Sequence, residues 1–283
     1  MRTYLDCIPC FLRQTLSAAR ALGLDEEDSA DLMREALGRL QRFDWALPPP
    51  LMGRDLHRLI RQRLGNPDPF LPRKREHTAW ALALLPDLEQ QIAASAHPFR
   101  AAVRLAIAGN VIDLGAGTGW TPETEAWFRE DAVDSVDGEA VDRLQREAAG
   151  AQEILFLADN AGEIVLDRPL LDRLGPDRVT VVVRGGPTIN DATLEDARRS
   201  GLLERYAVID NGSDAPGTHL PDCSAELVER FERADLVIAK GQGNFETLND
   251  AARTIWFLFL VKCSVPAEEL GVPVGTHVVH RIG

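Results

Sequence analysis

Four short apolar runs in the second half of the chain each end in acidic, amide and glycine residues, and this pattern most constrains the fold. The runs cover residues 153–157, 179–183, 206–209 and 235–239. Short apolar runs that alternate with amphipathic helical stretches are typical of buried parallel strands with helices on both faces of the sheet. The carboxyl ends of parallel strands lie along one edge, where open α/β sheets bind ligands. We therefore expect the four polar clusters to meet at that edge.

The first third of the chain shows no strand pattern. Apolar residues recur at helical spacing over 5–22, 26–43, 51–64 and much of 75–94, with a kink or break expected at Pro86. From about residue 98 the alternation of strands and helices begins, including a strand-like run at 107–114 and another at 275–279. We predict an all-helical N-terminal domain over residues 1–96 and an α/β domain with a mainly parallel sheet over residues 97–283.

Composition excludes several classes of protein. The formal net charge of −13 argues against a sequence-wide basic surface for nucleic acid, so we expect no nucleic-acid partner. The start of the chain has no apolar signal segment, and the longest apolar stretch, 255–261, is too short to span a bilayer. We expect that stretch to be a buried helix against the sheet. Four cysteines without a secretion signal favour a cytoplasmic, reducing location.

Asp159 and Asn160 stand directly behind the first of the four apolar runs. A carboxylate beside an amide carbonyl, where the backbone leaves a sheet, can ligate a hard cation. A simple turn is the alternative, because both residue types suit turns. The neighbouring clusters add carboxylates, amides, Arg184, Lys240 and glycine-rich backbone, which together suit a phosphate held by a divalent metal and a cation.

A glycine-rich loop suggests a different function. The sequence from Val111 to Gly119 resembles the first motif of S-adenosylmethionine-dependent methyltransferases, with Gly115–Gly119 as the loop that approaches the cofactor. Asp137 lies about twenty residues on, where an acidic residue would meet the ribose hydroxyls. This alternative leaves Asp159, Asp191 and the segment 240–246 without a role.

Taken together, the motifs resemble the damage-control phosphatase family, whose members share an ARMT-like metal-binding domain. The matching segments, in order along the chain, are 5–14, 108–113, 159–163, 184–191, 212–214, 240–246, 262–263 and 270–273. The paired cysteines near the N-terminus make the chain look like the stand-alone microbial branch. The order of these segments over nearly the whole chain carries the resemblance.

The resemblance implies a helical N-terminal part on a three-layer α/β/α domain and the hydrolysis of phosphate monoesters of small metabolites, often sugar phosphates or damaged metabolites. It implies one divalent metal held by Asp159, Asn160 and Asp191, and a phosphate contact from Lys240. The histidines form no ligand spacing, so oxygen ligation favours Mg²⁺ or Mn²⁺, although Co²⁺ or Ni²⁺ can also bind such a set. For Asp191 the alternative is the N-cap of a helix over 192–200.

Other residues of these segments receive roles by inference. Arg184 suits a bidentate phosphate contact, and we assign Asn190, Gly241 and its neighbouring amides to the same phosphate-binding set. Glu163 is either a base, a hydrogen-bond partner of a metal ligand, or a favourable charge in the first turn of a helix. Asn244 either orients substrate or caps a helix that begins near Phe245.

Some candidates have equally plausible structural roles. Asn110, Asp113, Ser213 and Asp214 either line the site or belong to turns. Cys7 and Cys10 have CxxC spacing, and a redox or metal role with Cys263 competes with ordinary burial in a helix.

The mechanistic hypothesis is direct hydrolysis by a metal-activated water, with Lys240 and Arg184 offsetting charge on the transferring phosphoryl group. An aspartyl-phosphate on Asp159 is the alternative chemistry, although no Asp-x-Asp follows the strand. A non-catalytic protein that binds a phosphorylated metabolite at the same edge is a further alternative. Oligomeric state is left open.

Overall fold

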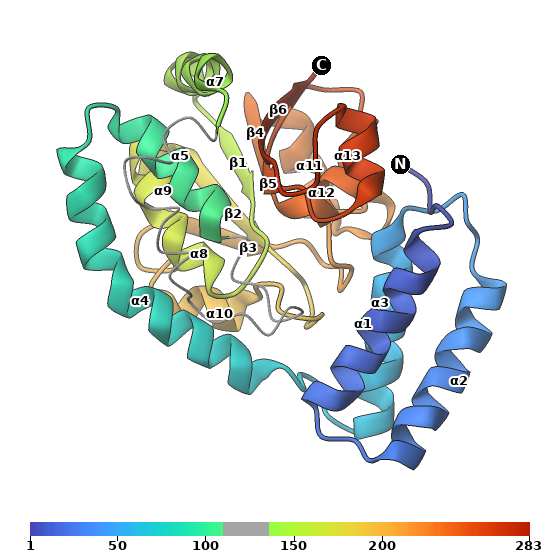
Figure 1. Ribbon diagram of the computed structural model, residues 1–283. Coiled ribbons are helices and arrows are strands. Elements are labelled where there is room, and N and C mark those ends of the chain that lie inside the picture. The colour runs from blue at the N-terminus through green and yellow to red at the C-terminus, as the bar shows by residue number, and fades with distance from the viewer. Residues whose placement is uncertain (110–135) are drawn as a thin grey trace.

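The computed structural model describes residues 1–109 and 136–283, and it is an α/β fold around one six-stranded sheet (Figure 1). The strand order is β3-β2-β1-β4-β5-β6, and all neighbouring pairs are parallel except the antiparallel pair of β5 and β6. The strands are β1 Ile154–Leu157, β2 Val179–Val183, β3 Ala207–Asp210, β4 Leu236–Lys240, β5 Ile255–Leu260 and β6 His277–Ile282. The predicted fold class, including the parallel arrangement of the first four strands, is confirmed.

Helices cover both faces of the sheet (Figure 1). In the α/β part they are α7 Gly138–Gly150, α8 Glu163–Leu166, α9 Arg168–Leu174, α10 Leu194–Arg199, α11 Ala225–Arg233, α12 Gly241–Leu248 and α13 Ser264–Leu270, with short 3₁₀ turns at Pro176–Arg178 and Leu220–Asp222. Side chains of β1 alternate between two apolar cores. Ile154 and Phe156 point into the core shared with α5, α7 and α9, whereas Leu155 and Leu157 point into the core shared with α11 and α12. This alternation produces the three layers.

The N-terminal part is helical, as predicted. Its helices are α1 Cys7–Ala21, α2 Glu26–Arg42, α3 Pro49–Leu64, α4 Leu71–Ala94 and α5 Pro98–Ala108. Helices α1, α2 and α3 lie side by side at one end of the molecule, and α4 runs from them along the outside of the α/β layers (Figure 1). Helix α4 continues through Pro86, so of the expected kink or break the break is wrong. Leu85, Leu88 and Ile92 anchor the helix in the core of the sheet. The domain boundary after residue 96 stays a prediction, and α4 shares its core with the sheet.

The run expected to be a strand at 107–114 begins in helix α5 and otherwise lies mostly outside the described residues. A second element was predicted wrongly. The apolar stretch 255–261, expected to be a helix, contains strand β5, which pairs with β4 on one side and β6 on the other. An unbroken apolar run has no periodicity to separate strand from helix. Its short length and its aromatic side chains Trp256, Phe257 and Phe259 nevertheless favour a strand in the middle of a sheet. None of the helices within the described residues is long and apolar enough to cross a membrane.

Candidate active site

The loops that follow β1 and β2 are joined to each other at the carboxyl edge of the sheet. Asn160 and Asp191 form an isolated antiparallel bridge, and the Ala192 amide donates to the Asp159 carbonyl at 2.7 Å. On the other side, the Ala161 amide donates to the Asn190 carbonyl at 2.9 Å. This backbone pairing brings Asp191, 32 positions along the chain from Asp159, beside the Asp159-Asn160 pair. The two predicted carboxylate ligands and the predicted amide ligand therefore come together.

Arg184, which follows β2, lies between the two carboxylates. Its Nε donates to Asp191 Oδ2 at 2.6 Å, and its Nη2 approaches Asp159 Oδ1 at 3.5 Å. The side chain is only 1% exposed. The buried guanidinium pairs with both aspartates and so fixes their positions. Removing it would be costly, because the buried carboxylates would lose their compensating charge. The phosphate contact predicted for Arg184 stays a prediction, and in this structure Asp159 and Asp191 are its ionic partners.

The Asn160 side chain connects this group to Glu163. Its Nδ2 donates to Asp159 Oδ2 at 2.9 Å and to Glu163 Oε2 at 2.8 Å. Because the amide nitrogen serves the two carboxylates, the carbonyl oxygen is the atom that Asn160 can offer to a cation. Glu163 is in the first turn of α8 and also accepts from Lys240, so both of its oxygens hold neighbours in place.

Burial and like charge raise the pKa of Asp159 to about 8. Desolvation is the largest cause, the negative charges of Glu163 and Asp191 add to it, and Arg184 and Lys262 oppose it. A carboxylate in such surroundings is stabilised by additional positive charge. No three His, Cys, Asp or Glu side chains within 1–109 and 136–283 group so as to hold a metal. A metal at this edge would therefore need the Asn160 amide oxygen beside Asp159 and Asp191, and this all-oxygen set fits a hard divalent cation.

A second buried ionic group lies behind the first. Lys240, the last residue of β4, is fully buried, and its Nζ donates to Glu163 Oε1 at 2.5 Å, to Asp167 Oδ1 at 2.6 Å and to the Ala106 carbonyl at 2.7 Å. Burial lowers the pKa of Lys240, but the charges of Asp167 and Glu163 raise it more, and the net shift is upward. The three acceptors match the three protons of the ammonium group. A phosphate would reach Lys240 only by displacing one of them, so the predicted phosphate contact stays a prediction.

Asp167 was not among the predicted site residues. Burial raises its pKa to about 7, with Lys240 lowering it and Glu163 raising it. Its position four residues after Glu163 was the available signal, since positions four apart on a helical segment face the same side.

Glycine at 241 allows α12 to begin beside Asp159. Gly241 has a φ of +80°, and a Cβ built on it would lie 2.1 Å from Asp159 Oδ2. The helix therefore starts at the residue that touches the candidate ligand, which places its first backbone amides at the same edge, as expected. Asn244 lies inside α12, so the capping role considered for it is wrong. Its Nδ2 donates to the Lys240 and Ala158 carbonyls at 2.7 and 3.2 Å, joining the ends of β1 and β4.

The helix cap considered for Asp191 is also wrong. Helix α10 begins at Leu194 and is capped by Thr193, whose backbone N and Oγ1 both donate to Asp196 in a capping box. Asp191 is thus not needed as a cap, and it forms an ion pair with Arg184. Two residues before it, Ile189 has a φ of 42°, an unfavourable value for a β-branched residue.

The remaining candidates fall in four places. Asn190 lies in the turn that leads to Asp191. Ser213 Oγ accepts from the Ala215 amide at 3.2 Å, which is a turn interaction, and Asp214 pairs with Arg58 and Arg61 of α3. Asn110, Asp113 and the Gly115–Gly119 loop lie outside the described residues. Asp137 caps α7, where its Oδ1 accepts from the amides of Glu139 and Ala140.

The cysteines are all free thiols. Cys7 and Cys10 lie in the first turn of α1, and Cys263 follows β5, where Gln242 Nε2 approaches its sulfur at 3.4 Å. Burial, with smaller effects of Glu246 and Cys263, raises the pKa of the Cys7 thiol to about 11. A thiol with so high a pKa is a poor nucleophile at neutral pH. The expected burial of the pair in a helix is wrong, because Cys7 is only partly buried and Cys10 is exposed.

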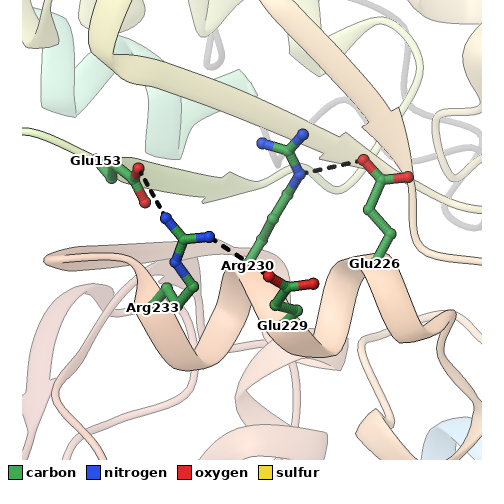
Figure 2. Close-up of a pocket in the computed structure, with 5 residues that line it drawn as sticks. All are labelled: Glu153, Glu226, Glu229, Arg230 and Arg233. Atoms are coloured by element: carbon green, nitrogen blue, oxygen red, sulfur yellow. Dashed lines mark hydrogen bonds and ion pairs between the residues drawn. The ribbon is translucent and has the colours of Figure 1, made fainter.

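A surface hollow elsewhere is lined by charged residues of both signs (Figure 2). Arg230 pairs with Glu226, and Arg233 pairs with Glu229 and Glu153. Glu153 precedes β1, so this hollow lies at the amino ends of the strands, away from Asp159. Its exposed ion pairs are typical of a solvated helix face.

Comparisons with known proteins identify relatives over the full length. The family model described as the damage-control phosphatase ARMT1-like domain matches residues 3–278. The damage-control phosphatase PH1575 of Pyrococcus horikoshii is 33% identical, covering 99% of this chain and 98% of that protein. A damage-control phosphatase of Archaeoglobus fulgidus is 30% identical, covering 95% of each. The crystal structure of PH1575, described as a duf89 family protein, superposes with a TM-score of 0.88 at 32% identity over 99% of both chains.

Proposed function

The chain belongs to the damage-control phosphatase ARMT1-like family, and we propose that it is a metal-dependent phosphatase that hydrolyses phosphate monoesters of small metabolites. The observation that carries the proposal is the meeting of Asp159, Asn160 and Asp191 around Arg184 at the carboxyl edge of the sheet. Sugar phosphates or damaged phosphometabolites are the proposed substrates.

Asp159, Asn160 and Asp191 would hold one divalent cation, with Mn²⁺ or Mg²⁺ favoured and Co²⁺ or Ni²⁺ also suited. Such a cation supplies positive charge to phosphate oxygens and lowers the pKa of a water molecule. Two carboxylates and one amide leave positions for substrate and water.

The other buried groups of the chain keep these three side chains in place. Arg184 fixes Asp191 and Asp159 through its 2.6 Å and 3.5 Å contacts. Glu163 accepts a hydrogen bond from the Asn160 amide nitrogen at 2.8 Å, which leaves the carbonyl oxygen as the atom that would ligate the cation. Lys240 in turn holds Glu163 and Asp167. In this mechanism Glu163 positions Asn160 instead of acting as a base, since both of its oxygens are already engaged.

The backbone amides at the start of α12 offer hydrogen bonds to phosphate oxygens that approach past Gly241. The hypothesis is direct attack by water on the phosphoryl group. The alternative is attack by Asp159 Oδ1 or Oδ2, which contact Arg184 and Asn160 respectively.

The test is phosphate release from a panel of sugar phosphates and an aryl phosphate, after removal of metal and addition of Mg²⁺, Mn²⁺, Co²⁺ or Ni²⁺. Asp159→Ala and Asp191→Ala should abolish metal-dependent release and the metal-induced rise in melting temperature. Asp142→Ala serves as the matched control, because Asp142 is a half-exposed aspartate paired with Arg100 outside the site. Full release by either site variant would refute the assignment. Binding of the esters without release under any metal would favour the non-catalytic alternative.

A further inference from the structure

Helix α4 packs against both of the loops that carry the candidate metal ligands, and Figure 1 shows it running past α8 and α10, which follow those loops. On one side, a Cβ built on Gly162 would lie 3.0 Å from His77 Cβ and 3.1 Å from the His77 carbonyl oxygen, so the loop backbone lies directly against α4. On the other side, Lys74 of α4 forms an ion pair with Asp196 of α10 at 2.7 Å. Positions three apart on a helix are neighbours, so the same side of α4 meets both loops.

Lys74 is a fully buried lysine, and such a residue is costly to remove from water unless it is paired. Its Nζ lies 2.7 Å from Asp196 Oδ2 and 3.1 Å from Asp68 Oδ2. The Asp196 side chain is itself only 1% exposed. Replacing a buried ion pair with apolar residues is often neutral or stabilising. The arrangement that the pair fixes therefore explains it better than a gain in stability does.

Asp196 connects Lys74 to the segment that carries Asp191. Asp196 Oδ2 accepts from the Thr193 backbone amide at 2.9 Å and from Thr193 Oγ1 at 2.7 Å, in addition to the Lys74 ammonium group. Thr193 stands two positions after Asp191 and pairs with Arg184 in an isolated parallel bridge. One buried carboxylate oxygen thus joins α4 to the backbone beside the candidate ligand.

We propose that Lys74 is a positioning residue of the candidate metal site, which holds the Asp191 segment in place through Asp196. This inference rests on the proposed function, in which Asp191 is a metal ligand. Lys74 touches neither metal nor substrate in this role. The helical N-terminal part thereby takes part in the reaction, because α4 keeps the two ligand-bearing loops at the separation that one cation requires.

The experiment compares Lys74→Met with wild type. Methionine keeps an unbranched side chain and removes the ammonium group. When the metal-free proteins are titrated with Mn²⁺ in a calorimeter, the dissociation constant should rise about tenfold, the lower end of the range for residues that support metal ligands. At saturating Mn²⁺ the KM for 4-nitrophenyl phosphate should stay at the wild-type value, because Lys74 does not touch the substrate.

Hydrogen exchange reports on the same segment without a metal. The Ala192 amide donates to the Asp159 carbonyl at 2.7 Å, and this contact joins the two ligand-bearing loops. A loop that opens locally exposes such an amide to solvent without unfolding the whole chain. In metal-free Lys74→Met the Ala192 amide should therefore exchange faster than in wild type.

Asp68→Asn is the matched control. Asp68 pairs with the same ammonium group, but it lies in the loop before α4, and its replacement leaves the ion pair between Lys74 and Asp196 in place. This variant should lower the melting temperature, because it weakens a buried ion pair. It should leave both the Mn²⁺ dissociation constant and the exchange of the Ala192 amide unchanged.

Wild-type Mn²⁺ affinity and wild-type exchange of the Ala192 amide in Lys74→Met would show that the ion pair is only structural and would overturn the inference. Equal effects of Asp68→Asn and Lys74→Met would also overturn it. If Lys74→Met does not fold, Thr193→Val removes the next link, the bond from Oγ1 to Asp196. Weaker Mn²⁺ binding by that variant supports the inference, and wild-type affinity overturns it.

The readouts separate this inference from the proposed function. If wild type binds Mn²⁺ and hydrolyses no ester, the phosphatase function fails, and the Mn²⁺ dissociation constants still decide the role of Lys74. If wild type binds no metal, the metal-dependent function fails, and the exchange of the Ala192 amide decides. Faster exchange in Lys74→Met alone then supports the positioning role, and equal exchange in wild type and Lys74→Met refutes it.

Discussion

Replacing Gly241 with alanine tests the arrangement at the sheet edge with one methyl group. The added Cβ would lie 2.1 Å from Asp159 Oδ2, whereas Cβ contacts under 3.0 Å are essentially never seen, so the carboxylate must move by at least 0.9 Å. A misplacement of about 1 Å at a reacting centre can cost about 100-fold in rate. We expect Gly241→Ala to lower metal-dependent phosphate release by about 100-fold, equivalent to ~2.7 kcal/mol.

The backbone effect of this substitution must be separated from the contact. Gly241 has a φ of +80°, which costs an alanine ~1–2 kcal/mol by itself. Gly271, at the end of α13, has a φ of +66° with no atom of the described residues within 4 Å of a built Cβ. Gly271→Ala should therefore lose ~1 kcal/mol of unfolding free energy and keep full activity.

The assay is phosphate release at saturating metal, with urea unfolding of both variants. A Gly241→Ala protein that is folded and within threefold of wild-type activity would refute the placement of Asp159 beside α12. A Gly271→Ala protein with equally low activity would show that the effect comes from destabilisation and not from the carboxylate.

Two further perturbations test the buried charges. Lys240→Met leaves Glu163 and Asp167 buried without their cation, so urea unfolding should show a loss of ~3–5 kcal/mol; a loss below ~1 kcal/mol would contradict the ion pairs. His57 has a folded-state pKa of about 3, below its ordinary 6.5, so the unfolded chain takes up a proton first as the pH falls. Its contribution is fully present above pH 6.5 and is lost on acidification, by ~2 kcal/mol between pH 6.5 and 5. Urea unfolding of wild type and His57→Asn at several pH values should show this slope only in wild type, and equal slopes would refute it.

The sheet could be predicted because buried parallel strands appear in the sequence as short apolar runs that are followed directly by polar residues. The ends of β1, β2, β3 and β4 were found in this way. Strand β5 was missed because its sequence is apolar at every position, and an unbroken run looks the same in a strand and in a buried helix. The conformation of β5 is decided by its pairing with β4 and β6. Strand β6 is separated from β5 in the sequence by helix α13.

The meeting of Asp159, Asn160 and Asp191 at the sheet edge could also be predicted, but the partners of the neighbouring cations could not. Lys240 was expected to contact a phosphate from the family resemblance, and Arg184 because a guanidinium suits a bidentate phosphate contact. In the structure, the partner of Lys240 that sequence reasoning missed is Asp167, 73 residues away, and Arg184 is held by Asp159, 25 residues away. Contacts over such separations depend on the crossover topology of the sheet and leave no periodic signal in the sequence.

The partners that were missed change how the site should be understood. Six ionisable groups form one continuous buried set, because Asn160 donates to both Asp159 and Glu163 and so joins the two clusters. The six are Asp159, Glu163, Asp167, Arg184, Asp191 and Lys240. Four carboxylates stand against two cations, so the fully ionised set carries two negative charges in excess.

Burying that excess of negative charge is unfavourable, and the effect is seen in the pKa values of two of the carboxylates. The pKa of Asp159 is raised to about 8 and that of Asp167 to about 7, in each case with burial as the main cause. Two protons would neutralise the set, and so would one divalent cation, which also leaves Asp159 and Asp191 free to act as anionic ligands. This balance supports the proposed divalent metal from the charges of the chain alone. It also explains why a lysine with no exposed surface belongs to the site. Lys240 neutralises the carboxylates behind Asn160, so that the charge left for the cation is at Asp159 and Asp191.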